Sequence, residues 1–259
     1  MLESLNNKVA WVTGAGTGIG QAGAVALAKN GAQVILSGRR KETLEETAGM
    51  IVQLGAKPIL EILDVSDPQA VQSVADHIVE RYGRLDILVN NAGTNVTERH
   101  WGIVTPEKWN QVIGIDLNGA FYCAAAAIPI MRKQKDGLII NISSWAGRFY
   151  SYVTGPAYSA AKFGLVAMNA SINLEECIHG IRACVICPAE VWTPIIDRRP
   201  DALSVEEKSK MLKSEDLGET ILFVARLPKH VCINELVISP TWNRTYVHDF
   251  SRPPLDKQE

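Results

Sequence analysis

Short apolar runs alternate with longer stretches of helical periodicity along most of this chain. The apolar runs predict strands at Val9–Thr13, Gln33–Leu36, Pro58–Leu63, Ile87–Val89, Leu138–Ile142, Ala183–Ile186 and Leu236–Ile238. Helical stretches lie between them, including Gln21–Asn30, Glu42–Leu54, Pro68–Tyr82, Pro106–Met131, Ala157–His179 and Leu217–Ala225. Nearly continuous apolar strands separated by helices are typical of a parallel sheet covered on both faces. The pattern therefore predicts an α/β fold, a three-layer, doubly wound parallel sheet of about seven strands with right-handed crossovers.

The chain is expected to form a single domain with its site built in. No internal repeat, low-complexity tract or linker divides residues 1–259, and this length suits one α/β unit. The irregular stretch from Trp192 to Ser204 holds Pro194, Pro200 and several charges. Residues 192–213 are therefore expected to be either a lid over a substrate or a plain surface loop. The tail, residues 242–259, is polar and is either partly disordered or placed over a neighbouring chain.

Composition and charge exclude several classes of protein. The chain is 47% hydrophobic, enough for a sizeable core, and its formal net charge of −2 gives no basic excess for a nucleic-acid partner. The N-terminus is polar where a signal peptide is apolar. The longest apolar helical run, Ala120 to Met131, contains Pro129 and is too short to span a bilayer. We therefore expect a cytoplasmic protein with no membrane partner, and we expect its five cysteines to be reduced core thiols.

A glycine-rich turn follows the first predicted strand and opens the first predicted helix. Glycines let the backbone turn tightly and approach a pyrophosphate, and a helix N-terminus offers free N–H groups and a positive dipole end. The spacing departs from the strict G-x-G-x-x-G pattern because position 19 is isoleucine. Its place after the first strand still predicts dinucleotide binding by Gly14, Gly16, Thr17, Gly18, Ile19 and Gly20.

The end of the second predicted strand indicates which dinucleotide binds. An acidic residue about 20 positions after the glycines would bind the ribose 2′-hydroxyl of NAD. The run from Leu36 to Arg40 holds no carboxylate, and Arg39 can instead grip a 2′-phosphate with its fork of donors. The alternative is that Arg39 and Arg40 only begin a solvated helix. We favour NADP(H) over NAD(H) as the cofactor.

Three further segments carry a family resemblance. Asn90-Asn91-Ala92-Gly93 follows the fourth predicted strand, and Ser143-Ser144 follows the fifth. The segment Tyr158-Ser159-Ala160-Ala161-Lys162 begins 14 residues after Ser144. In this order and spacing, and together with the glycine turn, these motifs resemble the short-chain dehydrogenase/reductase family over residues 7–240. The resemblance implies a Rossmann-type fold and an oxidoreductase similar to carbonyl reductases.

The chemistry of these residues supports the same interpretation. Reduction of a ketone needs a hydride donor and an acid near the carbonyl oxygen, and a free tyrosine hydroxyl, with a pKa of about 10, is a poor acid at neutral pH. Lys162 lies one helical turn after Tyr158, and its positive charge favours the tyrosinate form. Ser144 can donate a hydrogen bond to the substrate oxygen, where charge develops in the transition state.

The resemblance also assigns cofactor contacts by position. Ala189 stands where relatives usually have glycine, so the backbone there is expected to be slightly displaced. In relatives the lysine also holds the nicotinamide ribose. From the adenine to the nicotinamide, the implied contacts are Asp64, Val65, Asn90, Ala92, Gly93, Tyr158, Lys162, Pro188, Val191 and Thr193.

One catalytic position departs from the family pattern. Relatives have an asparagine there, in a sequence close to N-L-x-G, and it helps to hold a water that touches the lysine and starts a proton relay. This chain has Asp116 at that position. An ionised aspartate donates no hydrogen bond, and it would stabilise the Lys162 ammonium while weakening its pull on Tyr158. Either the relay tolerates Asp116, which is our hypothesis, or Asn118 substitutes after a backbone shift, or activity is reduced or altered.

Aromatic residues gather around the expected site. Trp145, Phe149 and Tyr152 lie between the serine and the tyrosine, and Trp192 follows the sixth predicted strand. These side chains are either ordinary packing or, as we slightly favour, an apolar substrate pocket for an aromatic or cyclic ketone.

Other motifs carry weaker signals. Cys184 and Cys187 match C-x-x-C, but they lie on or beside a strand rather than at a helix N-terminus, so buried thiols are expected. The five histidines fall in no ligand spacing, and no metal site is expected. By the resemblance, small and apolar faces on the helices at 106–131 and 157–179 predict a homodimer or homotetramer.

The sequence as a whole favours an NADP(H)-dependent oxidoreductase that interconverts a ketone and a secondary alcohol, with Tyr158 as general acid and base. Its partner is then a small-molecule carbonyl or alcohol substrate. Two alternatives stay open: epimerase, dehydratase or imine reductase chemistry on the same fold, and a non-catalytic NADP(H)-binding protein. The intact Ser144, Tyr158 and Lys162 argue against the second.

Overall fold

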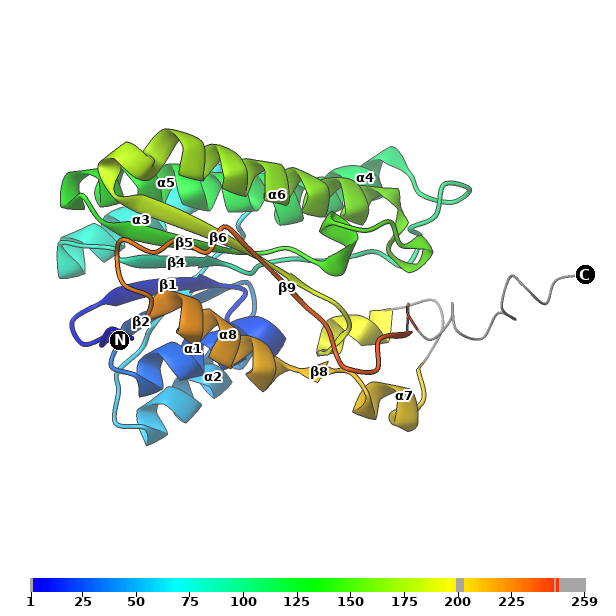
Figure 1. Cartoon of the computed structure of the whole chain (residues 1–259), viewed down its shortest axis with the longest axis horizontal. Helices are drawn as coiled ribbons and strands as arrows, with labels where there is room; N and C mark the ends of the chain where they lie inside the picture. The colour runs from blue at the N-terminus through cyan, green and yellow to red at the C-terminus, as the bar shows by residue number, and fades with distance from the viewer. Residues whose placement is uncertain (1, 199–202, 245, 247–259) are drawn as a thin grey trace, which may run out of the picture.

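A seven-stranded sheet with all pairings parallel forms the centre of the molecule (Figure 1). The computed structural model describes residues 2–198, 203–244 and 246. The strand order is β3-β2-β1-β4-β5-β6-β9. The strands are β1 (Val9–Thr13), β2 (Gln33–Gly38), β3 (Ile59–Ile62), β4 (Ile87–Asn90), β5 (Gly137–Ile142), β6 (Ile181–Pro188) and β9 (Glu235–Ile238). All seven predicted strands are therefore present, with ends that shift by up to two residues.

Helices cover both faces of this sheet, which confirms the Rossmann-type, doubly wound prediction (Figure 1). One face carries α1 (Gly18–Lys29), α2 (Lys41–Gln53) and α8 (Ser214–Ala225). The other carries α3 (Pro68–Tyr82), α5 (Gly119–Gln134) and α6 (Gly155–Glu176), with α4 (Pro106–Ile113) beside α6. The order of the strands reverses between β1 and β4. In open α/β sheets, ligands bind outside the carboxyl ends of the strands at such a reversal.

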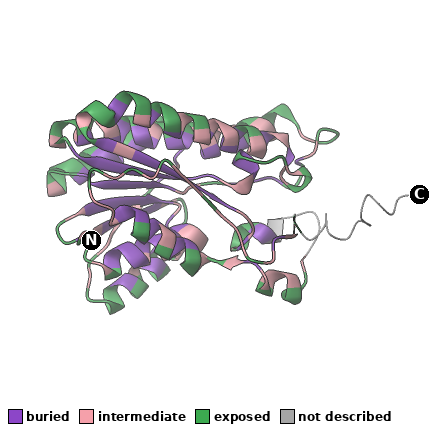
Figure 2. Cartoon of the chain, viewed as in Figure 1, coloured by how far each residue is buried: buried purple, intermediate pink, exposed green. Residues whose placement is uncertain are grey.

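Strand residues alternate between two separate cores. Val9 and Trp11 of β1 pack into the core on the α3, α5 and α6 side, whereas Ala10 and Val12 pack into the core on the α1, α2 and α8 side. The sheet is consequently buried along its centre, and exposed residues lie on the outer surfaces of the helices (Figure 2). The buried indole N–H of Trp11 is satisfied because it donates to Ser37 Oγ at 2.8 Å.

A π-helical segment, Gly114–Asn118, joins α4 and α5 into one continuous helix. The sequence predicted a single helix over Pro106–Met131 and missed this segment. The joined helix, Pro106–Gln134, has 29 residues and is long and apolar enough by composition to cross a membrane. Its buried side chains, such as Cys123 and Met131, belong to the core against the sheet, which accounts for its apolar character. π-Segments within α-helices frequently occur at functional sites.

The segment expected to be a lid contains secondary structure that the sequence did not predict. β7 (Val191–Trp192) pairs with β8 (Leu212–Lys213), and the helices between them are the 3₁₀ turn Pro194–Arg198 and α7 (Val205–Ser209). Part of the segment, residues 199–202, lies outside the described residues, as does most of the expected tail at 242–259. Three more 3₁₀ turns, Trp145–Gly147, Tyr152–Thr154 and Cys177–His179, flank α6.

The cysteines divide into two groups. Cys184 and Cys187 are buried in β6, and burial raises the pKa of these thiols to about 12 and about 11. This agrees with the expectation of buried, unreactive thiols for the C-x-x-C match. The expectation that all five are core thiols was wrong, because Cys177 and Cys232 are exposed. Cys177 lies in the 3₁₀ turn after α6 and Cys232 in the loop before β9, where neither core reaches.

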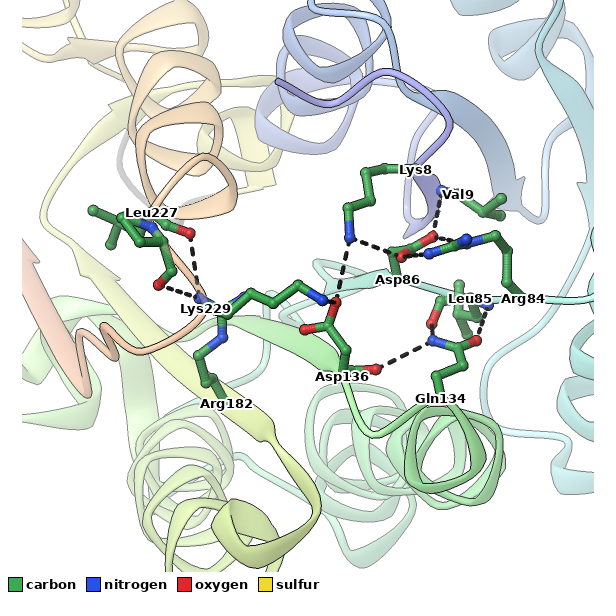
Figure 3. A network of polar contacts seen from close by, with 11 residues as sticks. Lys8, Val9, Arg84, Leu85, Asp86, Gln134, Asp136, Arg182, Leu227 and Lys229 are labelled. Carbon is green, nitrogen blue, oxygen red and sulfur yellow. Dashed lines mark hydrogen bonds and ion pairs between the residues drawn. The ribbon is translucent and has the colours of Figure 1, made fainter. Parts of the chain in front are cut away.

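A charged cluster ties the amino ends of the strands together, opposite the expected site (Figure 3). Asp86, just before β4, accepts hydrogen bonds from Arg84 at 2.6 and 2.8 Å, from Lys8 at 3.1 Å and from the Val9 N–H at 2.9 Å. Asp136, just before β5, pairs with Lys8 at 3.3 Å and with Lys229 at 2.7 Å. Burial alone would raise the pKa of Asp86, but its donors outweigh burial and hold the pKa below the ordinary 3.8.

We expect Asp86→Asn to lower the free energy of unfolding at pH 7 by about 2 kcal/mol. This is less than the ~3–5 kcal/mol of a fully buried pair, because Arg84 and Lys8 keep part of their hydration. Because folding lowers the pKa of Asp86, its carboxylate stabilises the fold fully at any pH above the pKa that Asp86 has in the unfolded chain. This stabilisation is lost as the pH falls through the pKa of the folded protein. Urea unfolding should therefore show a difference in the free energy of unfolding between variant and native protein that becomes smaller below about pH 4. Asp76→Asn, on the exposed face of α3, is the control, and an equal loss in both variants would contradict the prediction.

Candidate active site

The backbone of the glycine turn between β1 and α1 leaves little room for side chains. Gly14 and Gly18 have φ angles of +62° and +61°, in the left-handed region that favours glycine. A Cβ on Gly14 would lie 2.8 Å from Asn91 Nδ2 and 2.9 Å from Ala92 Cα. The turn is thus pressed against the segment that follows β4, and a dinucleotide can approach its backbone closely.

The first turn of α1 leaves its N–H groups without side-chain acceptors. Thr17 is the N-cap residue, its side chain makes no capping hydrogen bond, and no acidic residue lies in the first turn. A 12-residue helix with an uncapped N-terminus offers free donors and a positive dipole end to an anion. This end of α1 fits the pyrophosphate of a dinucleotide.

Asn91, which the sequence analysis did not single out, braces the glycine turn. Its side-chain amide donates to the carbonyl oxygens of Thr13 at 3.0 Å and Gly14 at 3.1 Å. The Thr13 hydroxyl accepts from the backbone N–H groups of Asn91 and Ala92 at 3.0 and 3.1 Å. These bonds join residues about eighty positions apart, so no local pattern could reveal them.

Three buried asparagines, joined by hydrogen bonds, connect β4, β5 and α6 next to the glycine turn. Asn90 donates to Ala120 O at 3.1 Å and to Asn141 Oδ1 at 3.0 Å, and Asn141 donates to Asn169 Oδ1 at 2.9 Å. Asn90 thus holds β4 to β5 and to the start of α5. Asn141 and Asn169 were missed because asparagine in a strand or a helix gives no motif.

The Lys162 ammonium lies buried at the centre of the site. Its Nζ is 3.3 Å from Asp116 Oδ2, donates to Ile142 O at 3.1 Å, and lies 5.4 Å from the centre of the Tyr158 ring. The structure thus brings together Asp116, Tyr158 and Lys162, of which the spacing paired Tyr158 with Lys162 and the resemblance placed Asp116. A Cβ on Gly93 would lie 3.2 Å from Asp116 Oδ2 and 3.5 Å from Lys162 Nζ. A larger residue at position 93 would therefore crowd the pair formed by Asp116 and Lys162.

Asp116 lies on the π-segment and is almost fully buried. Its Oδ1 accepts from the Thr94 N–H at 2.7 Å, an interaction that asparagine would also make. Burial raises the pKa of the Asp116 carboxyl, while Lys162 and the Thr94 N–H oppose that rise. Burial also acts to lower the pKa of Lys162, but the Asp116 carboxylate and Tyr158 outweigh it and raise that pKa. Lys162 is therefore held as an ammonium.

Two loop residues missed in the sequence fix the start of α6, on which Tyr158 stands. Asn95 Nδ2 donates to Thr154 O at 3.0 Å, and the buried Arg99 donates from Nε to Val96 O at 2.7 Å and from Nη1 to Val153 O at 3.3 Å. Ser144, in an extended conformation after β5, has its Oγ near the Ala146 N–H at 3.2 Å. Tyr158 and Ser144 are both partly exposed, as catalytic groups that meet a substrate must be.

The expected adenine and 2′-phosphate contacts lie at the ends of β2 and β3. The Arg39 guanidinium is 3.8 Å from Asp64 Oδ2, and both side chains are largely exposed. Burial acts to raise the pKa of Asp64, but hydrogen bonds from Ser66 and the charge of Arg39 lower it overall. Val65 is buried beside Gly119. Arg39 is thus available to an anion, with Asp64 as its present partner.

The loop after β6 meets the glycine turn from the other side. A Cβ on Gly18 would lie 3.1 Å from Thr193 Cγ2, so Thr193 and the glycine turn face each other closely. Val191 and Pro188 are buried, and the Ala189 N–H donates to Ile238 O at 2.8 Å. The residues assigned to the nicotinamide end are therefore placed beside those assigned to the pyrophosphate.

The four expected pocket aromatics do not form one cluster. Trp145 and Phe149 lie together, with ring centres 4.4 Å apart. Tyr152 is highly exposed and stacks on His100 at 4.5 Å, and Trp192 is half-exposed on β7. Within the described residues, no group of His, Cys, Asp and Glu side chains is arranged to hold a metal ion.

We expect Gly14→Ala to lower the free energy of unfolding by about 2 kcal/mol or more, because alanine is strained at positive φ and its Cβ overlaps Asn91 and Ala92. Gly49→Ala, at an open position inside α2, should instead raise stability by about 0.5–1 kcal/mol. Denaturant unfolding of the two variants checks both signs. Equal effects would mean that the turn relaxes away from Asn91.

Comparison with known proteins assigns this architecture to a family. The family model described as short chain dehydrogenase matches residues 8–203. An uncharacterized oxidoreductase of Staphylococcus aureus (strain USA300) is 34% identical over 236 residues, which cover 91% of this chain and 98% of the relative.

Solved structures agree with that assignment. The crystal structure of levodione reductase superposes with a TM-score of 0.84 at 26% identity, covering 91% of this chain and 97% of that one. A metagenomic short-chain oxidoreductase in complex with NADP superposes with a TM-score of 0.80 at 30% identity, covering 93% and 100%. With the glycine turn, the Ser-Tyr-Lys residues and these likenesses in agreement, the chain belongs to the short-chain dehydrogenase family of oxidoreductases.

Proposed function

We propose that this protein is an NADP(H)-dependent oxidoreductase that interconverts a ketone and a secondary alcohol, with Tyr158 as the general acid and base. The observation that carries the proposal is the buried Lys162 ammonium, 5.4 Å from the centre of the Tyr158 ring and beside the wall of the dinucleotide cradle at Gly93. A fixed cation next to a tyrosine is suited to proton transfer at neutral pH. The cradle itself fits a dinucleotide at Gly14, Gly18 and the free N-terminus of α1.

The residues of this chain have separate roles in the proposed reaction. A bound nicotinamide cofactor supplies the hydride for the carbonyl carbon or accepts it from the alcohol. Ser144 donates a hydrogen bond to the substrate oxygen and holds it in place. Tyr158 gives its hydroxyl proton to that oxygen during reduction and takes it back during oxidation. Lys162 stabilises the tyrosinate form that arises between these steps, and Asp116 holds the ammonium in position.

The preference for NADP(H) rests on charge. Arg39 directly follows β2 and has an exposed guanidinium, and β2 carries no carboxylate that would repel a 2′-phosphate. Arg39 has only an exposed partner at 3.8 Å, Asp64, and a phosphate carries more charge than this carboxylate. The NADP complex of the metagenomic relative is in keeping with this choice.

We also propose that the protein acts as a homodimer or homotetramer. Large apolar side chains are exposed at Phe121 on α5, at Leu174 on α6 and at Ile178 in the 3₁₀ turn after α6. Apolar side chains on neighbouring helices suit a two-fold contact in which the same face meets itself. Sedimentation at micromolar concentration would show a monomer if this part of the proposal is wrong.

Absorbance of the reduced nicotinamide tests the main proposal. NADPH and NADH are each offered with aliphatic, cyclic and aryl ketones, and native protein should oxidise NADPH with a preference for one class of ketone. Tyr158→Phe keeps the ring but removes the proton, so its turnover should fall by about 10³-fold or more while NADPH still binds. Unchanged turnover in Tyr158→Phe, or bound NADPH with no turnover of any ketone by native protein, would overturn the proposal.

Arg39→Leu should weaken NADPH binding by about tenfold or more and leave NADH binding within about twofold, because only NADPH carries the 2′-phosphate. Arg40→Leu is the matched control, since Arg40 is also exposed at the start of α2. Dissociation constants from nucleotide fluorescence measure both effects. Equal losses for the two nucleotides would show that Arg39 does not select the cofactor.

We expect Asp116→Asn to stay active within about tenfold of the native protein, because asparagine also accepts from the Thr94 N–H. Without the carboxylate, the Lys162 charge acts undiminished on its surroundings, so the pH–rate profile should move toward lower pH. Asp116→Leu removes the acceptor as well and should lose both activity and stability. A gain in turnover of tenfold or more in Asp116→Asn would mean that the aspartate is a handicap.

A further inference from the structure

The last described residues of the chain return to the carboxyl edge of the sheet. After β9 ends at Ile238, the chain runs past the loop that follows β6 and past α7 (Figure 1). We call residues 239–244 together with Tyr246 the C-terminal strap. The sequence left two interpretations for residues 242–259, partial disorder or a cover for a neighbouring chain, and the few described residues among them contact the loop after β6 and α7 of the same chain.

Arg244 joins the strap both to the loop after β6 and to α7. Its Nε lies 3.3 Å from Glu190 Oε2, in the loop after β6, and its Nη1 lies 3.3 Å from Glu207 Oε1, on α7. The other oxygen of Glu207 accepts from the Ser204 N–H and completes the capping box of α7. All three charged side chains are partly buried, so solvent screens these pairs less than fully exposed ones.

Neighbouring residues of the strap strengthen the same contact. The Lys210 ammonium lies 4.8 Å from the centre of the Trp242 ring, a cation–π arrangement, and it also pairs with Glu206 at 2.7 Å. Asn243, between Trp242 and Arg244, is buried. Polar and aromatic contacts therefore fix the strap on α7 at successive positions.

The strap also places an aromatic ring against Trp145, the residue after the proposed catalytic Ser144. Tyr246 meets Trp145 edge to face, with ring centres 5.8 Å apart at 69°, and Trp145 meets Phe149 at 4.4 Å. Trp145 directly follows Ser144 in the chain. Three aromatic rings from two distant segments thus form one surface, which begins at the residue after Ser144.

We propose that the C-terminal strap is the outer wall of the substrate site and selects carbonyl substrates that carry a flat apolar group such as a phenyl ring. The proposal rests on the function proposed above. Arg244 is the positioning residue, because it holds the strap across the lid, and Tyr246 is the specificity residue, because its ring completes the surface of Trp145 and Phe149. Aromatic rings favour edge-to-face or offset contact with a flat apolar group over contact with a small aliphatic one.

The role of Arg244 is tested without catalysis, by hydrogen exchange of the amides of residues 205–213 in the free protein. Arg244→Met should raise their exchange about tenfold, whereas Arg81→Met, on the exposed end of α3, should leave it unchanged. Glu207→Gln keeps the cap but loses the charge, so its effect should be smaller. In the double variant, Glu207→Gln should raise the exchange by less than it does in the native protein, because its partner Arg244 is already replaced. Equal exchange in the native protein and Arg244→Met overturns the proposal, whatever reaction the protein catalyses.

The role of Tyr246 is tested with acetophenone and butanone as a pair of ketones. Tyr246→Leu should lower kcat/KM for acetophenone about fivefold through KM, with kcat nearly unchanged, and should change butanone less than about twofold. Tyr150→Leu, at a highly exposed tyrosine whose ring stacks on Phe163, is the control. Equal changes for the two ketones overturn the proposal.

If the native protein turns over neither ketone, saturation-transfer NMR of acetophenone on the NADPH-loaded protein decides instead. A weaker signal in Tyr246→Leu than in Tyr150→Leu supports the aromatic wall, and equal signals overturn it. The outcome for the wall is thus separate from the outcome for the proposed reaction.

Discussion

The parallel pairing of β1 with β4 is the contact on which the rest of the site depends. The chain leaves β1 to build β2 and β3 on one side and returns to place β4 on the other. The two strand ends then lie side by side, and Thr13 and Asn91 join them through their side chains. Because the glycine turn is pressed against this junction, its backbone conformation is fixed before any ligand arrives. The same junction continues through Gly93 to Lys162, so the dinucleotide cradle and the proton-transfer residues share one support.

A buried ion pair sets the electrostatics of that shared support. Lys162 lies between the Asp116 carboxyl and the Ile142 carbonyl, and all three come from different elements. The π-segment is what places Asp116 inside the helix layer at this depth. The pair carries little net charge, so Tyr158 faces an ammonium whose field is partly offset.

Much of the fold followed from the sequence because strands and helices here are long and strongly patterned. Buried strands such as β5 are continuous apolar runs, and α3 begins and ends where its proline and its glycine predict. The π-segment was missed because it keeps the helical pattern of its neighbours. β7 and β8 were missed because two-residue strands have no periodicity. The exposed Cys177 and Cys232 show that composition alone cannot place a thiol.

The motifs located the reacting residues, but the residues that hold them could not be found this way. Asn91 lies inside a recognised motif, yet its bonds reach across about eighty positions to Thr13 and Gly14. Arg99 and Asn95 act on the start of α6 from a loop about sixty residues earlier. Such contacts depend on the completed fold, because the partners share neither an element nor a spacing.

The order of the strands also bears on how the protein forms during synthesis. β1 to β5 pair with one another and carry the glycine turn and the segment after β4 that braces it, so this half can assemble once residues up to Ile142 have left the ribosome. Until β6 arrives, the apolar edge of β5 has no partner, and this is the stage at which the nascent chain is most exposed to aggregation and to chaperones. Residues 192–213 follow β6, and the strap comes after β9. The growing chain therefore completes the glycine turn that faces the nucleotide before it makes the strap that we propose contacts the substrate.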